Sequence, residues 1–152
     1  MTKHKHPVYP TPVPPEPIDP VPPSTLASQL QILCNTHRSS IGLDLWATVQ
    51  FAIDAATYHV QNMIQCGYFA HTVTDPCGST PVDLGTWMAK FLPQGIFGGE
   101  NIAYGYYTAD SVFAAFMGSP MHKALIENSI LHSSGIYVYD GHWSLVATMY
   151  KP

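Results

Sequence analysis

Two stretches in the first half of the chain carry apolar residues at three- and four-residue steps. This spacing gathers side chains on one face of an α-helix. Ser24 or Thr25 can cap the first helix, which we expect to extend as far as Gly42. The second pattern is the strongest in the sequence, and Gly67 is placed to end it. The apolar positions of the two faces are Leu26, Leu30 and Leu33, then Val49, Ile53, Ala56, Val60 and Met63.

Two further helices are predicted in the middle of the chain. Residues 80–83 (Thr-Pro-Val-Asp) offer an N-cap, a proline at the first helical position and an acidic third residue, and Pro93 ends this helix. Thr108 can cap the next helix, which Gly118 ends. The side chains expected to face the core are Leu84, Trp87, Met88 and Phe91, then Val112, Phe113, Phe116 and Met117.

Near the C-terminus the pattern changes to the alternation that is typical of strands. Residues 136–139 (Ile-Tyr-Val-Tyr) and 142–146 (His-Trp-Ser-Leu-Val) flank Asp140 and Gly141, a pair with a strong preference for two-residue hairpin turns. Helices followed by a hairpin predict an α+β fold in which helices cover a sheet.

Residues 1–23 form a separate, Pro-rich segment. Nine of the seventeen residues from Pro7 to Pro23 are proline, which fixes φ and removes backbone donors, so polyproline II is the natural conformation. We therefore divide the chain into an extended arm, residues 1–23, and one domain, residues 24–152. The arm is either a plain spacer or a ligand for an aromatic groove on a protein partner. Its Pro-x-x-Pro spacings are Pro7/Pro10, Pro12/Pro15, Pro14/Pro17, Pro17/Pro20 and Pro20/Pro23.

Composition excludes several classes of function. With 152 residues, 46% of them apolar, the chain is long enough for one hydrophobic core and too short for two ordinary domains, so we expect one folded unit. Charged residues make up 11% of the chain and the net charge is −4, so we expect no nucleic acid partner. No apolar run approaches the roughly 18 residues of a membrane-spanning helix. The first six residues also lack the apolar core of a signal peptide.

Three cysteines leave at least one thiol unpaired within a monomer. Cys66 and Cys77 are the pair that a disulfide would join, and the loop that they would close contains His71. Such a bond would restrain His71 and stabilise the fold by at most a few kcal/mol. In the alternative interpretation, these cysteines are buried free thiols.

Three short patterns place a titratable residue in apolar surroundings, where burial requires a polar partner. Two glycines before Glu100 allow its backbone to approach another segment closely. Ser119 and Pro120 begin a helix and place His122 in its first turn, where the helix dipole favours the neutral imidazole that metal binding or general base catalysis requires. The patterns are 69–72 (Phe-Ala-His-Thr), 98–103 (Gly-Gly-Glu-Asn-Ile-Ala) and 119–123 (Ser-Pro-Met-His-Lys).

These patterns follow the order and spacing of a known family. The sequence from residue 26 to 150 resembles the bacterial branch of the CAP superfamily, also called the SCP or cysteine-rich secretory, antigen 5 and pathogenesis-related 1 family. The resemblance rests on five motifs in one order and does not cover the arm. The motifs are 33–38 (Leu-Cys-Asn-Thr-His-Arg), 55–63 with His59, 69–71, 99–103 and 116–122 (Phe-Met-Gly-Ser-Pro-Met-His).

The resemblance implies an α-β-α sandwich with a central antiparallel sheet, and a cleft lined by two histidines and two glutamates. His71 and His122 match the two histidines, and Glu100 matches the glutamate of the Gly-Glu-Asn motif. Ser119 stands where many eukaryotic members carry the second glutamate, so the acid and base set is incomplete. We expect Asn101 to brace the Glu100 segment rather than to perform chemistry.

Two imidazoles and a carboxylate are a sufficient ligand set for Zn²⁺ or another divalent cation with one open position. Some members of the family bind such ions, so His71, Glu100 and His122 are the predicted metal ligands and the predicted catalytic residues. The alternative is a hydrogen-bonded cleft in which Glu100 bridges the two histidines. A nucleophilic hydrolase is disfavoured, because neither Ser119 nor Thr72 has the context of a nucleophile and no Asp is placed to orient a histidine.

The remaining polar residues of note have simpler interpretations. His59 lies within the second helix, and we expect it to pack or hydrogen-bond with the helix at residues 33–38. The tyrosines after the Gly-Glu-Asn motif form either a rim for a carbohydrate or peptide, or a cover over the edge of the sheet. They are Tyr104, Tyr106 and Tyr107.

The leading hypothesis is a CAP-like binding or interaction module without efficient turnover, held by its arm outside a cell or on a particle such as a virion. Its partners would be a protein that holds the arm and a peptide, carbohydrate or lipid in the cleft. A second hypothesis is a metal-assisted hydrolase of peptide or cell-wall material, with Glu100 as ligand or general base. A third is a structural virion surface protein with a vestigial cleft.

Overall fold

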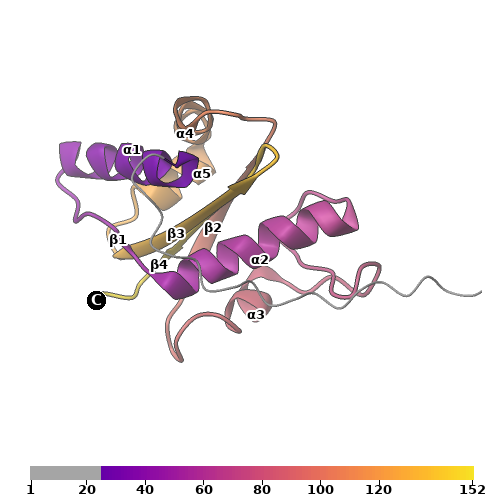
Figure 1. Cartoon of the computed structure of the whole chain (residues 1–152). Coiled ribbons are helices and arrows are strands. Elements are labelled where there is room, and N and C mark those ends of the chain that lie inside the picture. The colour runs from indigo at the N-terminus through magenta and orange to yellow at the C-terminus, as the bar shows by residue number, and fades with distance from the viewer. Residues whose placement is uncertain (1–24) are drawn as a thin grey trace, which may run out of the picture.

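The computed structural model describes residues 25–152, and the arm predicted at residues 1–23 lies outside the described residues. In the described part, a four-stranded sheet has helices on both faces (Figure 1). This is the α+β sandwich that the resemblance implies. Its strands are β1 (Ala47–Thr48), β2 (Gly98–Tyr104), β3 (Ser133–Tyr139) and β4 (His142–Thr148), in the order β1-β3-β4-β2.

The three long strands of the sheet are antiparallel, as the resemblance implies, and only the short β1 is parallel to its neighbour. β4 lies between β2 and β3 and is antiparallel to both. β1 is only two residues long and pairs in parallel with the start of β3, Ala47 with Ser133 and Thr48 with Ser134. β1 belongs to the segment that carries the chain from one face of the sheet to the other, and this crossing follows the open edge of β3.

The helices are divided between the two faces (Figure 1). α1 (Leu26–Ser40), α4 (Ala109–Gly118) and α5 (Pro120–Ile126) cover one face, and α2 (Gln50–Cys66) and α3 (Leu84–Met88) cover the other. Thr25 caps α1 through a hydrogen bond from the backbone N–H of Ser28. Gly67 ends α2 with a φ of 68°, a left-handed conformation that glycine adopts without strain. The start of α1 and the end of α2 therefore both confirm the sequence prediction.

The third helix begins later than the sequence predicts. α3 starts at Leu84, and Asp83, not Thr80, is the N-cap that accepts a backbone hydrogen bond from the first turn. Val82 instead forms an isolated antiparallel bridge with Val73, through backbone hydrogen bonds of 2.8 and 3.0 Å. The bridge uses the backbone donor and acceptor of Val82 outside a helix, so the helix can start only after it.

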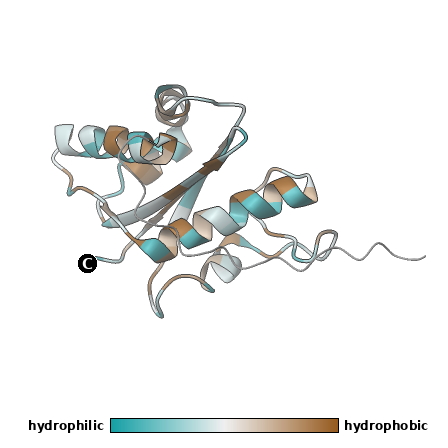
Figure 2. Cartoon of the chain, in the orientation of Figure 1, coloured by the Kyte–Doolittle hydropathy of each residue, from teal (hydrophilic) through white to brown (hydrophobic). Residues whose placement is uncertain are grey.

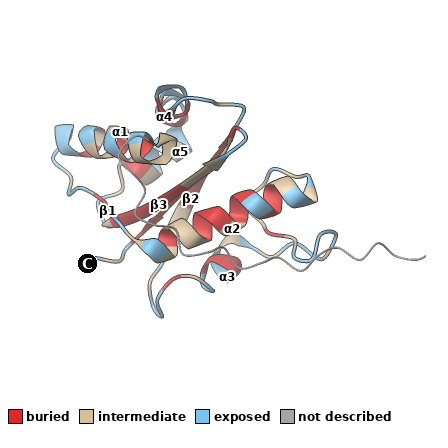
Figure 3. Cartoon of the chain, viewed as in Figure 1, coloured by how far each residue is buried: buried red, intermediate tan, exposed pale blue. Residues whose placement is uncertain are grey.

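Each face of the sheet has its own hydrophobic core (Figures 2 and 3). Trp143 and Phe116 are large buried side chains under α1, α4 and α5, and Trp87 is buried under α2. The close approach of α2 to the sheet depends on Gly135 in β3. A Cβ atom there would lie 2.1 Å from the backbone nitrogen of Ile53, a separation that no packed structure tolerates.

A buried guanidinium organises the face that α1 covers. The side chain of Arg38 has no exposed surface, and its guanidinium carbon lies 4.7 Å from the ring centroid of Trp46. Burial lowers the pKa of Arg38, and backbone carbonyls rather than a carboxylate satisfy its N–H groups. The four carbonyl oxygens, at 2.7 to 3.0 Å, belong to Asp44, Ile126, Asn128 and Leu131.

Cys66 and Cys77 form a disulfide, which confirms one of the two alternatives drawn from the sequence. Their Cα atoms are 5.2 Å apart, and the closed loop contains His71. Cys34 is a free thiol in α1. Its burial raises its pKa to about 12, so the thiol stays protonated and unreactive.

Replacing Gly135 with alanine should lower the free energy of unfolding by about 2 kcal/mol or more, because the added methyl group would overlap the backbone of α2. Urea unfolding followed by circular dichroism measures this difference. Gly118→Ala is the matched control, since a Cβ at Gly118 meets nothing within 4 Å. It should leave stability unchanged or raise it by roughly 0.5 kcal/mol. Equal stabilities of the two variants would contradict the close packing of α2 on β3.

Candidate functional site

The carboxylate of Glu100 lies at the centre of a buried polar cluster on the face of the sheet that α2 covers. Its side chain has no exposed surface. Oε1 lies 2.5 Å from Nδ1 of His59 and accepts a hydrogen bond of 2.6 Å from Oγ of Ser144. Oε2 lies 3.0 Å from Nδ1 of His71. We call these four residues the Glu100 cluster. They come from β2, α2, β4 and the loop that follows α2.

The register of the sheet places Glu100 and Ser144 together. Ser144 in β4 is opposite Ile102, two residues along β2 from Glu100 and therefore on the same face. The two glycines before Glu100 allow close approach, as the sequence predicts. A Cβ at Gly98 would lie 2.7 Å from a backbone oxygen of β4, and one at Gly99 would lie 2.6 Å from the side chain of Leu125 in α5.

His71 lies at the boundary between the buried cluster and solvent. Its backbone oxygen accepts a hydrogen bond of 2.8 Å from the indole N–H of Trp87, and the disulfide closes its loop. The side chain is 46% exposed. Because Nδ1 faces Glu100, the other ring nitrogen, Nε2, lies on the edge of the ring directed away from the buried carboxylate.

His122 occupies the first turn of α5, as the sequence predicts. The side-chain amide of Asn101 donates a hydrogen bond of 2.9 Å to the backbone oxygen of His122, which confirms its bracing role. The imidazole of His122 packs against Phe116, with ring centroids 5.2 Å apart. Ser119 occupies the N-cap position of α5 without a side-chain cap hydrogen bond.

Electrostatics distinguish the two partly exposed histidines. The hydrogen bond to Glu100 raises the pKa of His71 and outweighs the opposing effect of burial. Burial, followed by the nearby charge of His71, lowers the pKa of His122. Burial alone would raise the pKa of Glu100, but the hydrogen bonds of its cluster outweigh that effect and hold the pKa below its ordinary value. The site therefore combines an anionic Glu100, a readily protonated His71 and a neutral His122.

Glu100 bridges two histidines, but they are His59 and His71 rather than the expected His71 and His122. The expected contact of His59 with residues 33–38 is wrong, because α1 and α2 lie on opposite faces of the sheet (Figure 1). A signal for His59 was present in the sequence. It follows Ala56 by three residues on the buried face of the helix, and a fully buried imidazole requires a polar partner.

Metal binding at this site stays a prediction. Both oxygens of Glu100 are hydrogen-bonded within the cluster, and the side chain has no exposed surface, so the carboxylate is not open to a cation from solvent. Among residues 25–152, no group of three or more His, Cys, Asp or Glu side chains is arranged to hold a metal ion. The set of His71, Glu100 and His122 does not fit a three-ligand metal centre in this arrangement.

The three tyrosines after the Gly-Glu-Asn motif have different environments. Tyr104 and Tyr107 are exposed, while Tyr106 packs against the core, and its backbone oxygen accepts a hydrogen bond from the indole of Trp143. The three side chains therefore do not form one continuous rim or one cover over the sheet edge.

No model of a known protein family matches the sequence, and no curated protein matches it. Several solved structures share its fold. An extracellular protein with an SCP domain from Bacillus anthracis is 25% identical, with a TM-score of 0.71 over 88% of this chain and 45% of that protein. An outer surface protein from Borrelia burgdorferi is 17% identical, with a TM-score of 0.69 over 80% of this chain and 90% of that protein.

A cysteine-rich secretory protein from Staphylococcus aureus is 15% identical, with a TM-score of 0.61 over 80% of this chain and 37% of that protein. The chain thus spans less than half the length of the Bacillus and Staphylococcus proteins. The five ordered sequence motifs predict a sheet with a helical layer on each face. The described residues have this arrangement, and the neighbours share the fold. The chain has the fold of the CAP superfamily.

Proposed function

We propose that this chain is a CAP-like binding module that works outside a cell and binds its ligand at the imidazoles of His71 and His122. The setting is supported by similar structures, since the Bacillus protein is described as extracellular and the Borrelia protein as an outer surface protein. The described residues include no helix with the length and apolar character needed to cross a membrane.

The observation that carries this proposal is that both carboxylate oxygens of Glu100 are already hydrogen-bonded inside the protein. A glutamate that acts as a general base needs a carboxylate oxygen within reach of the substrate. In this protein both oxygens accept hydrogen bonds inside the cluster, and the side chain has no exposed surface. Glu100 therefore orients His71 and favours its protonated form, and it does not contact a ligand itself. The groups left to meet a ligand are Nε2 of His71 and the imidazole of His122.

These two imidazoles suit an oxygen-bearing ligand group. A protonated His71 presents an N–H donor at Nε2, and a neutral His122 has one donor and one acceptor. A carboxylate accepts strong hydrogen bonds from such donors. Peptide termini, acidic carbohydrates and fatty acids share this group, so we assign the ligand to the carboxylate-bearing class.

The Pro-rich arm completes the proposed function. In this proposal, residues 1–23 connect the module to a protein or particle that displays it. The support is the sequence, in which proline occupies more than half of the positions from Pro7 to Pro23. Attachment to a virion is one form of this display.

A metal-assisted hydrolase is the alternative that one observation favours. The hydrogen bond from His71 to a buried carboxylate is an arrangement that also orients metal-binding histidines. Any metal in this site would be held by His71 and His122, and it would activate a water molecule.

Elemental analysis of the purified protein decides between the binding module and the hydrolase. Stoichiometric zinc that is lost in both His71→Ala and His122→Ala would support the hydrolase, and zinc-free protein would count against it.

Replacing Glu100 with glutamine should lower the pKa of His71, because the charge that favours the imidazolium is removed. NMR titration of the histidine ring signals measures the shift. The variant should also be less stable by about 2 kcal/mol, because a charged hydrogen-bond acceptor is lost in a buried site. Glu127→Gln, which makes the same change beside His37, should leave the titration of His71 unaltered. An unchanged His71 pKa in Glu100→Gln would contradict the proposed role of Glu100.

The stability difference between the wild type and Glu100→Gln should depend on pH. The raised pKa of His71 contributes stability that is complete below its ordinary pKa of 6.5 and is lost as pH rises through the raised value. The lowered pKa of Glu100 contributes stability that is complete above its ordinary pKa of 4.5 and is lost as pH falls through the lowered value. The difference should therefore be largest between pH 4.5 and 6.5 in urea unfolding series. A difference that does not vary with pH would show that the ion pair does not form.

Carboxylate binding should weaken as pH rises through the raised pKa of His71, because the imidazolium then loses its proton. The probe is an acetylated alanine tripeptide with a free carboxylate, titrated while the histidine NMR signals are followed. Its affinity should be several-fold higher at about pH 5.5 than at about pH 8. The same peptide as a C-terminal amide is the control, and equal binding of the two would exclude a carboxylate site.

A further inference from the structure

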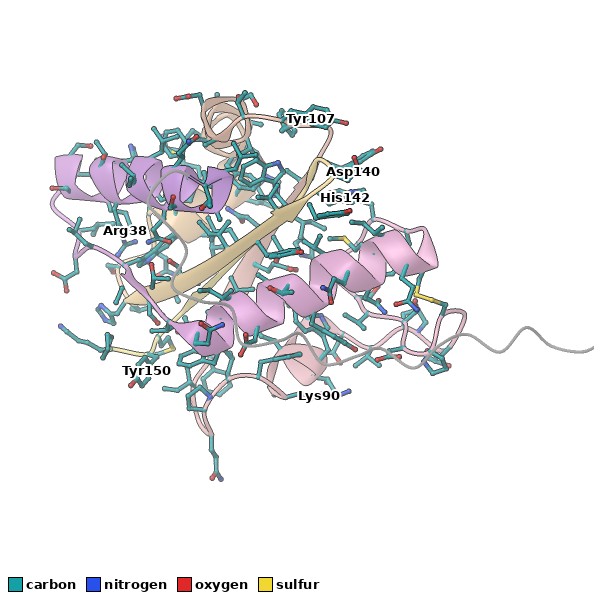
Figure 4. All side chains as sticks on the ribbon, in the orientation of Figure 1. Arg38, Lys90, Tyr107, Asp140, His142 and Tyr150 are labelled. Carbon is teal, nitrogen blue, oxygen red and sulfur yellow. A yellow bond between two sulfur atoms is a disulfide. The ribbon has the colours of Figure 1, made fainter. Side chains whose placement is uncertain are left out.

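A row of aromatic rings, exposed except for the partly buried His142, crosses the sheet at the end formed by the β3–β4 hairpin. Tyr104, His142 and Tyr139 are direct neighbours across β2, β4 and β3, so their side chains lie on one face. The rings of Tyr104 and His142 are 4.2 Å apart between centroids, and Phe69 lies 6.5 Å beyond Tyr104. We call these four residues the aromatic row. Figure 4 shows His142 beside the hairpin turn at Asp140.

The row is uncovered because the sheet extends beyond α2. The helix covers Glu100 and Ile102 on this face, but it ends at Cys66, and the next alternate position of β2 is Tyr104. Tyr104 is 57% exposed and Tyr139 is 61% exposed. Single exposed apolar side chains are ordinary, whereas adjoining exposed rings indicate a binding surface.

The spacing of the row matches one class of ligand. Neighbouring strands are about 4.8 Å apart, so Tyr104 and Tyr139, separated by two such steps, are roughly 9.6 Å apart. A polyproline II helix has three residues per turn and rises about 3.1 Å per residue, so prolines at i and i+3 lie on one side, about 9.3 Å apart. Aromatic surfaces bind Pro-rich segments through such prolines. The row is therefore spaced to receive a Pro-x-x-Pro segment.

The chain itself contains a suitable segment. Four prolines of the arm recur at every third position, a spacing that would place them on one side of a polyproline II helix. The last of them is two residues before Thr25, where the described chain begins. Leu26, the next residue, packs in the core of the α1 face together with Val138, so the arm starts on the opposite face of the sheet from the row. The four prolines are Pro14, Pro17, Pro20 and Pro23.

The arm is long enough to reach the row from this starting point. In polyproline II, the nine steps from Pro23 back to Pro14 cover about 28 Å. The seven residues of β3 cover roughly 23 Å, so the arm can pass around the hairpin end of the sheet. A segment tethered this closely has an effective concentration near the millimolar range. Even a weak intrinsic affinity between the prolines and the row is therefore enough for the segment to occupy it.

We propose that the aromatic row binds the Pro-rich segment 14–23 of the same chain, with Tyr104 and Tyr139 each stacking on one proline of a Pro-x-x-Pro pair. The arm then acts as a strap that holds the domain in a defined orientation relative to whatever carries residues 1–13. This inference goes beyond the proposed function and does not depend on the ligand of His71 and His122.

A spin label on the full-length chain tests the strap. Cys66 and Cys77 are bridged and Cys34 is buried, so Thr11→Cys introduces the thiol that a nitroxide reagent modifies. We expect paramagnetic loss of the backbone amide signals of residues 104, 139 and 142, and no loss at Trp87 under α2. Uniform loss over the domain surface, or no loss at the row, would overturn the proposal.

Paired variants of the labelled chain separate specific binding from general proximity. Pro17→Ser with Pro20→Ser removes two prolines of the series and should restore the row signals. Pro15→Ser with Pro22→Ser removes two prolines on other sides of the helix and should leave the signal loss in place. If both pairs behave alike, the proline register has no role and the proposal fails.

Substitutions in the row provide the reciprocal test, read at the amide of His142. Tyr104→Ser with Tyr139→Ser should abolish the signal loss, whereas Tyr107→Ser should preserve it. Tyr107 is an exposed tyrosine that packs near Gly141 outside the row (Figure 4). Signal loss in ¹⁵N-labelled chains caused by nitroxide on unlabelled chains would place the arm of a second copy on the row and overturn the same-chain strap. Carboxylate binding is measured separately, so either proposal can fail alone.

Discussion

A carboxylate buried inside a protein must be surrounded by hydrogen-bond donors, and Glu100 imposes this requirement on the fold. An unpaired charge in such a place would cost several kcal/mol, so its donors are as necessary as the packing around it. The donors come from α2, from β4 and from the loop that the disulfide closes. The position of α2 on the sheet and the position of His71 are therefore linked through one side chain.

Arg38 imposes a similar requirement on the opposite face of the sheet. Its guanidinium is as deeply buried as the carboxylate, and four backbone carbonyls accept its hydrogen bonds, three of them from residues 88 to 93 positions away. The carbonyls belong to Asp44 before β1, to the end of α5 and to the loop before β3, so Arg38 ties α1 to the start of both strands. Each face thus has a buried charge that is satisfied by groups far away in the sequence, and the two charges are not partners of one another.

The arrangement also separates the buried residues of the site from the partly exposed ones. Glu100, His59 and Ser144 are buried, and Glu100 holds His71 in place, whereas the side chains of His71 and His122 are partly exposed. The aromatic row continues from the same side, since Phe69 precedes His71 by two residues and Tyr104 follows Glu100 on the same face of β2. A polar site and an apolar surface are therefore adjacent on one side of the module, as our two proposals require.

Local sequence patterns were sufficient to predict the helices and the hairpin, because these elements depend on residues that are close together in the chain. Periodicity and caps located α1, α2, α4 and α5, the Asp-Gly turn located the β3–β4 hairpin, and ordered motifs identified the superfamily fold. Tertiary structure decided the rest. The pairing of Val73 with Val82 places the start of α3 later than the sequence predicts. The fold also brings Cys66 and Cys77 close enough to form their disulfide. It also gave Glu100 the partners His59 and Ser144 instead of His122, because the two helical layers lie on opposite faces of the sheet. The sequence determines which groups require a partner, but only the packing of distant segments brings a particular partner within hydrogen-bonding distance.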